Sequence, residues 1–192
     1  MKKFISIMMA AVMMLSLAAC GGSKDSNGGN AGALKDVNAL NVLETVWATY
    51  EEADMFPVAG GDYENSVMDA PGAFPLTDLE VLDSMLGVPA SIAEQIDNAA
   101  SLMHMMNANT FTCGSYQLKD GADMETFTTA LKDSIMNRQW MCGFPDTLIV
   151  AKVGGEYVVS VFGNAEVIEN FKNKLRETFP ITDIVYEESL TE

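Results

Sequence analysis

The fold is decided by one stretch of the chain, TLIVAKVGGEYVVSVF (residues 147–162). Residues 147–153 and 156–162 are rich in β-branched side chains, which favour strands. Gly154 and Gly155 lie between them and accept the positive φ angles of a tight two-residue turn. The stretch therefore predicts an antiparallel hairpin.

A helix is predicted directly after this hairpin, over residues 164–178. Asn164 can cap its first turn, and Pro180 lies just beyond its end. Apolar residues recur along it every three to four positions, which indicates one buried face. These residues are Val167, Ile168, Phe171 and Leu175.

A similar unit precedes the hairpin. Residues 99–106 and 110–119 read as two strands, and residues 122–139 carry apolar side chains at helical spacing. The two units share an order of elements, strand, strand and helix, but no residue-level similarity. We therefore predict two ββα units and no sequence repeat.

The chain before these units is predicted to be helical, with one interruption. Residues 36–50 show helical spacing, and residues 54–75 mix prolines, glycines and carboxylates without a period. This loop is long for a compact domain, and such loops are often functional. A capping box at residues 77–80 begins a helix that Gly87 ends, and a short helix is predicted at residues 89–95.

Together these elements predict an α+β fold. We expect an antiparallel sheet of about four strands, made by the two ββα units, with helices on one face and the N-terminal helical segment in front. Residues 181–186 can add an edge strand. The acidic end, with Glu187, Glu188 and Glu192, is expected to fray.

The N-terminus has the pattern of a lipoprotein signal. Residues 1–19 combine two lysines, a short apolar run and small residues, and Cys20 follows them. The pattern predicts a signal peptide at 1–19, lipidation of Cys20, a flexible Gly/Ser/Asn tether at 20–33 and one domain at 34–192. An ordinary signal peptide cut elsewhere is the alternative. The predicted location is the outer face of the cytoplasmic membrane, where the lipid is the anchor.

The charge of the chain is strongly acidic. It has 11 basic and 27 acidic residues, and loss of Lys2 and Lys3 with the signal leaves a formal charge of −18. Such a field repels nucleic-acid backbones and anionic lipid headgroups, so neither is an expected partner. Cationic partners remain open, and solubility is the simpler explanation of the charge.

Two further cysteines, Cys113 and Cys142, meet an oxidising compartment after export. They are a candidate disulfide, which would stabilise the fold by about 3 to 4 kcal/mol in the chain-entropy model. Two buried thiols are the alternative.

Candidate catalytic and metal-binding residues are few. His104 is the only histidine and lies in Met103-His104-Met105-Met106, but alternate strand residues point to opposite faces, which disfavours a copper site. No nucleophile elbow, phosphate loop or Cys-x-x-Cys pair is present. The long loop offers carboxylates, but a calcium loop's spacing is missing. These carboxylates are Asp54, Asp62, Glu64 and Asp69.

The two tryptophans are potential stacking platforms for sugars. Trp47 and Trp140 each lie on or next to a predicted helix, where burial explains them as well. We interpret both as core residues.

The chain resembles a family, the small lipoproteins of clostridia and related Firmicutes built around one uncharacterised domain. The resemblance covers most of residues 35–179. It implies a Firmicutes-like host and exposure outside the cytoplasm, and it brings no catalytic or binding residue. It is carried by Cys20 and its signal, Phe56-Pro57, Leu76-Thr77-Asp78, Met105-Met106-Asn107, Arg138, Gly143-Phe144-Pro145-Asp146 and Val153-Gly154-Gly155-Glu156-Tyr157-Val158.

The expected function is a membrane-anchored extracytoplasmic lipoprotein that acts as a non-enzymatic binding or envelope-assembly module, with no cofactor. Two alternatives remain open. One is an enzyme or accessory protein that acts on envelope glycans through the loop carboxylates. The other is a cation-binding lipoprotein.

Overall fold

The computed structural model describes residues 37–141 and 143–191. The predicted signal peptide, the lipidation site at Cys20 and the tether lie outside the described residues. Cys142 and Glu192 also lie outside them. Predictions about these parts of the chain stay predictions.

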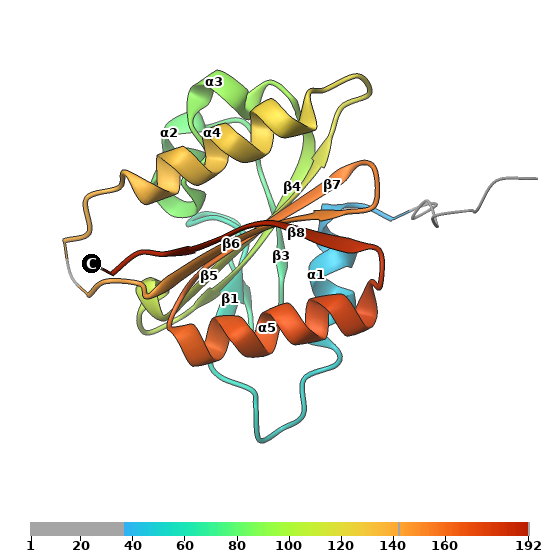
Figure 1. Cartoon of the computed structure of the whole chain (residues 1–192). Coiled ribbons are helices and arrows are strands. Elements are labelled where there is room, and N and C mark those ends of the chain that lie inside the picture. The colour runs from blue at the N-terminus through green and yellow to red at the C-terminus, as the bar shows by residue number, and fades with distance from the viewer. Residues whose placement is uncertain (1–36, 142, 192) are drawn as a thin grey trace, which may run out of the picture.

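The described chain forms an α+β domain around one antiparallel sheet of eight strands (Figure 1). Seven strands run in the order β2-β1-β4-β5-β7-β6-β8, and β3 pairs with β4 beside β1. The strands are β1 (Val58–Gly60), β2 (Val67–Met68), β3 (Gly72–Phe74), β4 (Ile96–His104), β5 (Phe111–Leu118), β6 (Thr147–Val153), β7 (Tyr157–Gly163) and β8 (Thr182–Ser189). The helices are α1 (Ala39–Trp47), α2 (Leu79–Leu86), α3 (Ala90–Ala93), α4 (Met124–Met136) and α5 (Ala165–Thr178).

The prediction of about four strands was an undercount. The strands β4, β5, β6 and β7 form the two predicted hairpins, and β8 is the predicted edge strand. The other three, β1, β2 and β3, lie in the segment predicted to be a loop. They have three, two and three residues, which is too short to show an alternating pattern. The strands β1 and β3 pair with the edge of β4, and β2 pairs with β1.

The prediction of helices on one face was wrong. Figure 1 shows α1 and α5 on one side of the sheet and α2, α3 and α4 on the other. The central strands are buried on both sides: Tyr157, Val159 and Val161 of β7 face α1 and α5. Val158 and Phe162 face α4. A sheet that is apolar on both faces needs helices on both to exclude water.

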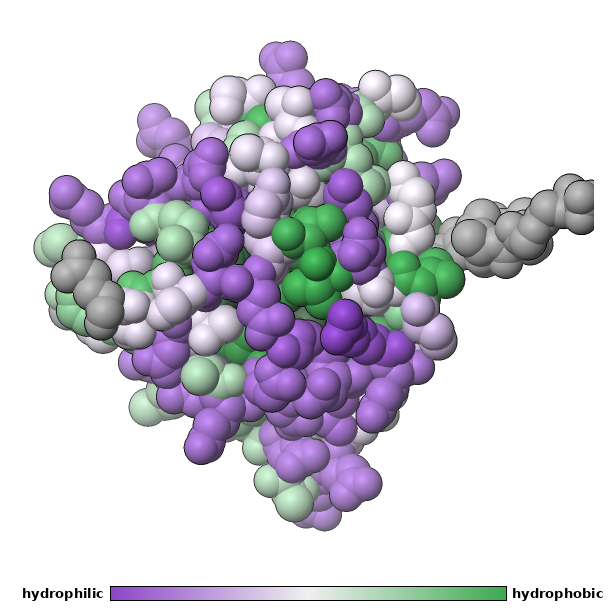
Figure 2. Space-filling view, viewed as in Figure 1, coloured by the Kyte–Doolittle hydropathy of each residue, from purple (hydrophilic) through white to green (hydrophobic). Residues whose placement is uncertain are grey.

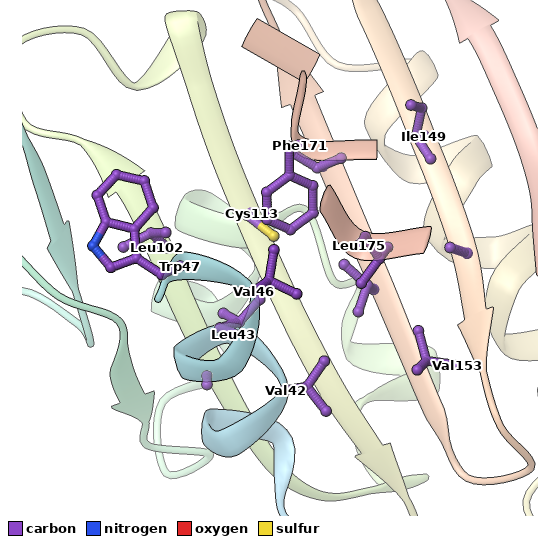
Figure 3. Close-up of a cluster of buried hydrophobic side chains, with 14 of the residues drawn as sticks. Val42, Leu43, Val46, Trp47, Leu102, Cys113, Ile149, Val153, Phe171 and Leu175 are labelled. Atoms are coloured by element: carbon purple, nitrogen blue, oxygen red, sulfur yellow. The ribbon is translucent and has the colours of Figure 1, made fainter. Parts of the chain in front are cut away.

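The core is therefore two clusters that share the sheet. The α1/α5 cluster contains Val42 and Val46 of α1 and Phe171 and Leu175 of α5, with Cys113 of β5 beneath them (Figure 3). Phe111 and Phe171 meet edge to face with ring centroids 5.5 Å apart. The α2/α4 cluster contains Leu82, Leu86, Tyr116, Phe127, Leu131 and Ile135. Full burial of each such side chain contributes about 1.5 to 3 kcal/mol to folding.

Polar side chains cap the first turn of four helices, α1, α2, α4 and α5. Asn38 and Asn41 form a reciprocal capping box at α1, and Asn164 caps α5 as predicted. The predicted box at residues 77–80 is displaced by one residue, because Asp78 is the N-cap of α2. Its carboxylate accepts hydrogen bonds from two backbone N–H groups, and a charged acceptor suits the positive end of a helix.

The predicted fraying of Glu187 and Glu188 was wrong, since both lie within β8. The ammonium group of Lys172 lies 2.5 Å from a Glu169 carboxylate oxygen and 2.8 Å from one of Glu187. These hydrogen bonds raise the pKa of Lys172 above its ordinary value. Lys172 lies on α5 and Glu187 on β8, so their contact joins the helix to the strand. Lys172 is only 9% exposed. Figure 2 shows the surface over α5 and α4 as mainly hydrophilic, with a hydrophobic patch over the middle of β8.

Candidate functional site

A pocket of about 640 Å³ lies at one end of the sheet. Its wall is built by the β1–β2 hairpin, the end of α2, the end of β4, the residues before β5 and the segment after α4. Five methionines from these separate segments line it, and we call it the methionine pocket. They are Met68, Met85, Met103, Met105 and Met141.

The methionines divide into a wall and a rim. Met85 and Met103 are half-buried and pack against the α2/α4 cluster. Met68, Met105 and Met141 are 56%, 43% and 93% exposed. Large apolar side chains gathered at a mouth are typical of a binding surface. Thioether side chains are flexible and polarisable, so they adapt to the shape of what they contact.

Trp140 forms an aromatic part of the wall. Its ring lies 5.3 Å from that of Phe162, and the guanidinium of Arg138 lies 5.6 Å from its centroid. The interpretation of Trp140 as a core residue was therefore incomplete, because it packs against the core and also lines the pocket. Trp47 is a core residue as predicted: it is 9% exposed and contacts Tyr50 and Phe56.

Arg138 fixes two walls of the pocket to each other. Its Nη2 donates hydrogen bonds to the backbone carbonyls of Asp83, at 2.8 Å, and Ser84. These carbonyls lie in the last turn of α2, and the carbonyl of Asp83 also accepts the backbone N–H of Gly87. A cation at this end also complements the helix dipole. Arg138 thus holds the segment after α4 against α2.

Asp62 closes the β1–β2 hairpin. Its Oδ1 accepts hydrogen bonds from the backbone N–H of Glu64 and from the backbone and side-chain N–H of Asn65, at 3.1, 2.6 and 2.9 Å. Desolvation acts to raise the pKa of Asp62, but these hydrogen bonds outweigh it and lower the pKa. Asp62 is the one carboxylate among the described residues that line the pocket.

The structure does not bring the loop carboxylates together. Asp54 lies 3.7 Å from Lys174 of α5 and does not line the pocket. Glu64 and Asp69 are exposed and lie outside the pocket wall. Only Asp62 of the four lines the pocket, so these residues do not form the carboxylate pair of a glycosidase there.

The side chains of His104 and Met103 pack on opposite faces of the sheet, although both residues line the methionine pocket. The imidazole ring stacks on Phe56, at 5.6 Å between centroids, and Phe56 packs against the α1/α5 cluster. Met103 packs against the α2/α4 cluster. The Nδ1 of His104 accepts hydrogen bonds from the backbone N–H groups of Met106 and Asn107. In the described ranges no group of three or more His, Cys, Asp or Glu is placed to hold a metal ion.

Cys113 is buried in the α1/α5 cluster and has no exposed surface. Burial raises the pKa of this thiol well above its ordinary value. Its candidate disulfide partner, Cys142, lies outside the described residues, so the pairing stays a prediction.

We expect iodoacetamide to leave Cys113 unmodified in the native protein, because only the exposed thiolate reacts. Mass spectrometry after alkylation, with and without denaturant and reductant, measures this. Modification of Cys113 in the denatured, unreduced protein excludes the disulfide. Rapid modification in the native protein contradicts the buried position.

Sequence reasoning missed this site because its residues are scattered. Met68 and Met141 are 73 positions apart, and no spacing rule joins them. The high methionine content, 14 of 192 residues, was the one available signal.

Comparison of the chain with protein-family models, with curated proteins and with solved structures gave no match. In the part of the chain that the structure describes, no helix has the length and apolar character needed to cross a membrane.

Proposed function

We propose that the chain is a membrane-anchored extracytoplasmic lipoprotein, held at the outer face of the cytoplasmic membrane by a lipid on Cys20. Its domain is a non-enzymatic binding module that takes a small apolar ligand into the methionine pocket. The observation that supports ligand binding is the methionine pocket itself. The signal pattern of residues 1–20 and the resemblance to clostridial lipoproteins support the anchor.

The size and lining of the pocket suit an organic molecule. Pockets of about 300 to 1,000 Å³ typically enclose small ligands, and most of their lining is apolar. A volume of about 640 Å³ lies in this range, and thioether and aromatic side chains dominate the wall. A metal ion needs several ligand atoms within about 2.5 Å of one point, and the described residues contain no group of three or more His, Cys, Asp or Glu placed in this way.

The polar groups of the pocket favour binding over catalysis. Among the described residues, no hydrogen bond joins a pocket hydroxyl to His104, whose Nδ1 already accepts two backbone N–H groups. The activated nucleophile of covalent catalysis needs such a base. Asp62 and Arg138 are held by the turn and the helix end that they stabilise.

The position of the pocket suits an anchored protein. The backbone N–H of Ala39 donates to Asn98, near the start of β4, whereas Met103 and His104 of the pocket lie at the end of β4. Six residues of strand separate the two points by about 20 Å. The described fold begins beside α1, at the end of the sheet away from the pocket (Figure 1). A lipid attached before residue 37 thus leaves the pocket mouth open to the outside.

Binding of the neutral apolar dye Nile red tests this function. The chain has two tryptophans, so Trp47→Phe leaves Trp140 in the pocket wall as the single reporter. We expect dye emission to saturate at one dye per protein and Trp140 fluorescence to be quenched in parallel. The double variant Met85→Gln/Met103→Gln should weaken binding about tenfold, because two apolar contacts become polar.

Met124→Gln is the matched control, since Met124 packs on the same cluster but does not line the pocket. It should bind dye as the parent does. Unsaturable binding, or equal binding by both variants, contradicts a ligand site in the methionine pocket.

A further inference from the structure

The wall of the methionine pocket contains one negatively and one positively charged side chain among its described residues, and the two differ in their hydrogen-bond partners. Asp62 and Arg138 are the carboxylate and the cation among the lining residues. The guanidinium of Arg138 donates to two backbone carbonyls and lies over the Trp140 ring, so its position is fixed by neutral partners. Ion pairs in the described ranges involve Lys132, Lys172 and Lys174, and none includes Asp62 or Arg138.

One oxygen of Asp62 remains available to a ligand. The three hydrogen bonds of the turn all reach Oδ1, and Oδ2 takes part in none of the hydrogen bonds between described residues. Desolvation acts to raise the pKa of this carboxyl, but the turn lowers it, so Asp62 is charged at neutral pH. A half-buried carboxylate beside an apolar surface is a counter-ion for a cationic group.

The apolar lining of the pocket and the negative electrostatic field of the domain both favour a ligand that is apolar and positively charged. Thioether and indole groups both make favourable contacts with an apolar chain. The net charge of the chain is −16, which raises the local concentration of cations and lowers that of anions.

From this arrangement we infer that the pocket selects a hydrophobic cation. The apolar body of the ligand lies against the methionines and Trp140, and its amine pairs with Oδ2 of Asp62. This inference rests on the proposed function, because it names the class of ligand that the same pocket takes.

Three probes with one eight-carbon chain test the inference, namely octylammonium, octanol and octanoate, each competing with Nile red. Octylammonium should displace the dye at a concentration about three to five times lower than octanol, in keeping with a partly exposed ion pair. Octanoate should be the weakest competitor. The advantage of octylammonium over octanol should shrink between 50 and 500 mM salt, because salt screens exposed charges.

Asp62→Asn removes the negative charge and keeps the turn, because an asparagine oxygen can accept the same three hydrogen bonds. This variant should lose the preference for octylammonium over octanol, measured as the ratio of the two concentrations that displace half of the dye. Asp69→Asn, which changes an exposed carboxylate of the same segment outside the wall, should keep the preference.

The outcomes separate the two proposals. If Nile red does not bind at one site, the proposed function fails. If the dye binds but octylammonium has no advantage, or if the advantage survives in Asp62→Asn, the pocket binds apolar molecules without selecting a cation and this inference is overturned.

Discussion

Replacement of Gly60 by alanine is expected to lower the free energy of unfolding by about 3 kcal/mol and to abolish dye binding in the methionine pocket. A Cβ atom at Gly60 would lie 1.9 Å from the backbone nitrogen of Gly72 and 2.7 Å from the carbonyl oxygen of Ser101. Both contacts are with backbone, so no side-chain rotation relieves them. Either β1 or β3 must move away from β4, and Gly60 itself lines the pocket.

Chemical denaturation of the parent and the variant measures this loss. Gly155→Ala is the matched control, because Gly155 lies in the exposed β6–β7 turn and an added Cβ meets nothing within 4 Å. That variant should stay within about 0.5 kcal/mol of the parent. Equal stability of the two variants would falsify the close approach of β1 and β3.

Cys20→Ala is expected to abolish lipidation and to move the protein from the membrane to the soluble fraction. The thiol at this position is the acceptor that the signal pattern predicts, and alanine offers no atom to acylate. Stable attachment needs the apolar free energy of acyl chains, which the acidic domain does not replace by electrostatic attraction.

Incorporation of labelled fatty acid and fractionation of the expressing cells measure this effect. Cys142→Ala removes a different cysteine and should leave both results unchanged. Labelling of Cys20→Ala at the parental level would show that the anchor is elsewhere. Nile red should bind the unlipidated domain as before, since the described fold begins at Val37.

The elements predicted best are those with long and regular patterns. The β6–β7 hairpin was predicted to within a residue at each end, because a double glycine separates two runs of β-branched residues. The α5 helix was predicted together with its Asn164 cap. In both, local preference and tertiary packing favour the same structure, which makes a sequence pattern dependable.

The layering of the domain was missed although a signal for it existed. YVVSVF in β7 is apolar at every position but Ser160, and an almost continuous apolar run is typical of a strand buried on both faces. Antiparallel sheets commonly have one face exposed to solvent, so the hairpin led to the prediction that helices cover only one face. No comparable signal was available for β1–β3, whose pairing depends on β4 rather than on their own residues.

The methionine pocket could not be predicted, because tertiary structure alone brings its parts together. Met103 and Met105 were noticed as possible copper ligands with His104, but strand alternation separates the ring from Met103. The partners that the methionines do have, Trp140 and the β1–β2 hairpin, come from distant segments.

The hydroxyl group of Tyr157 donates a hydrogen bond to the carbonyl of Val37, the first described residue. This bond and the one from Ala39 to Asn98 join the start of the domain to two central strands. A pull on the N-terminus therefore loads these two bonds and the nine-residue α1 first, at the end of the sheet away from the pocket. Tension between an anchor and the domain would be carried without distorting the mouth of the methionine pocket.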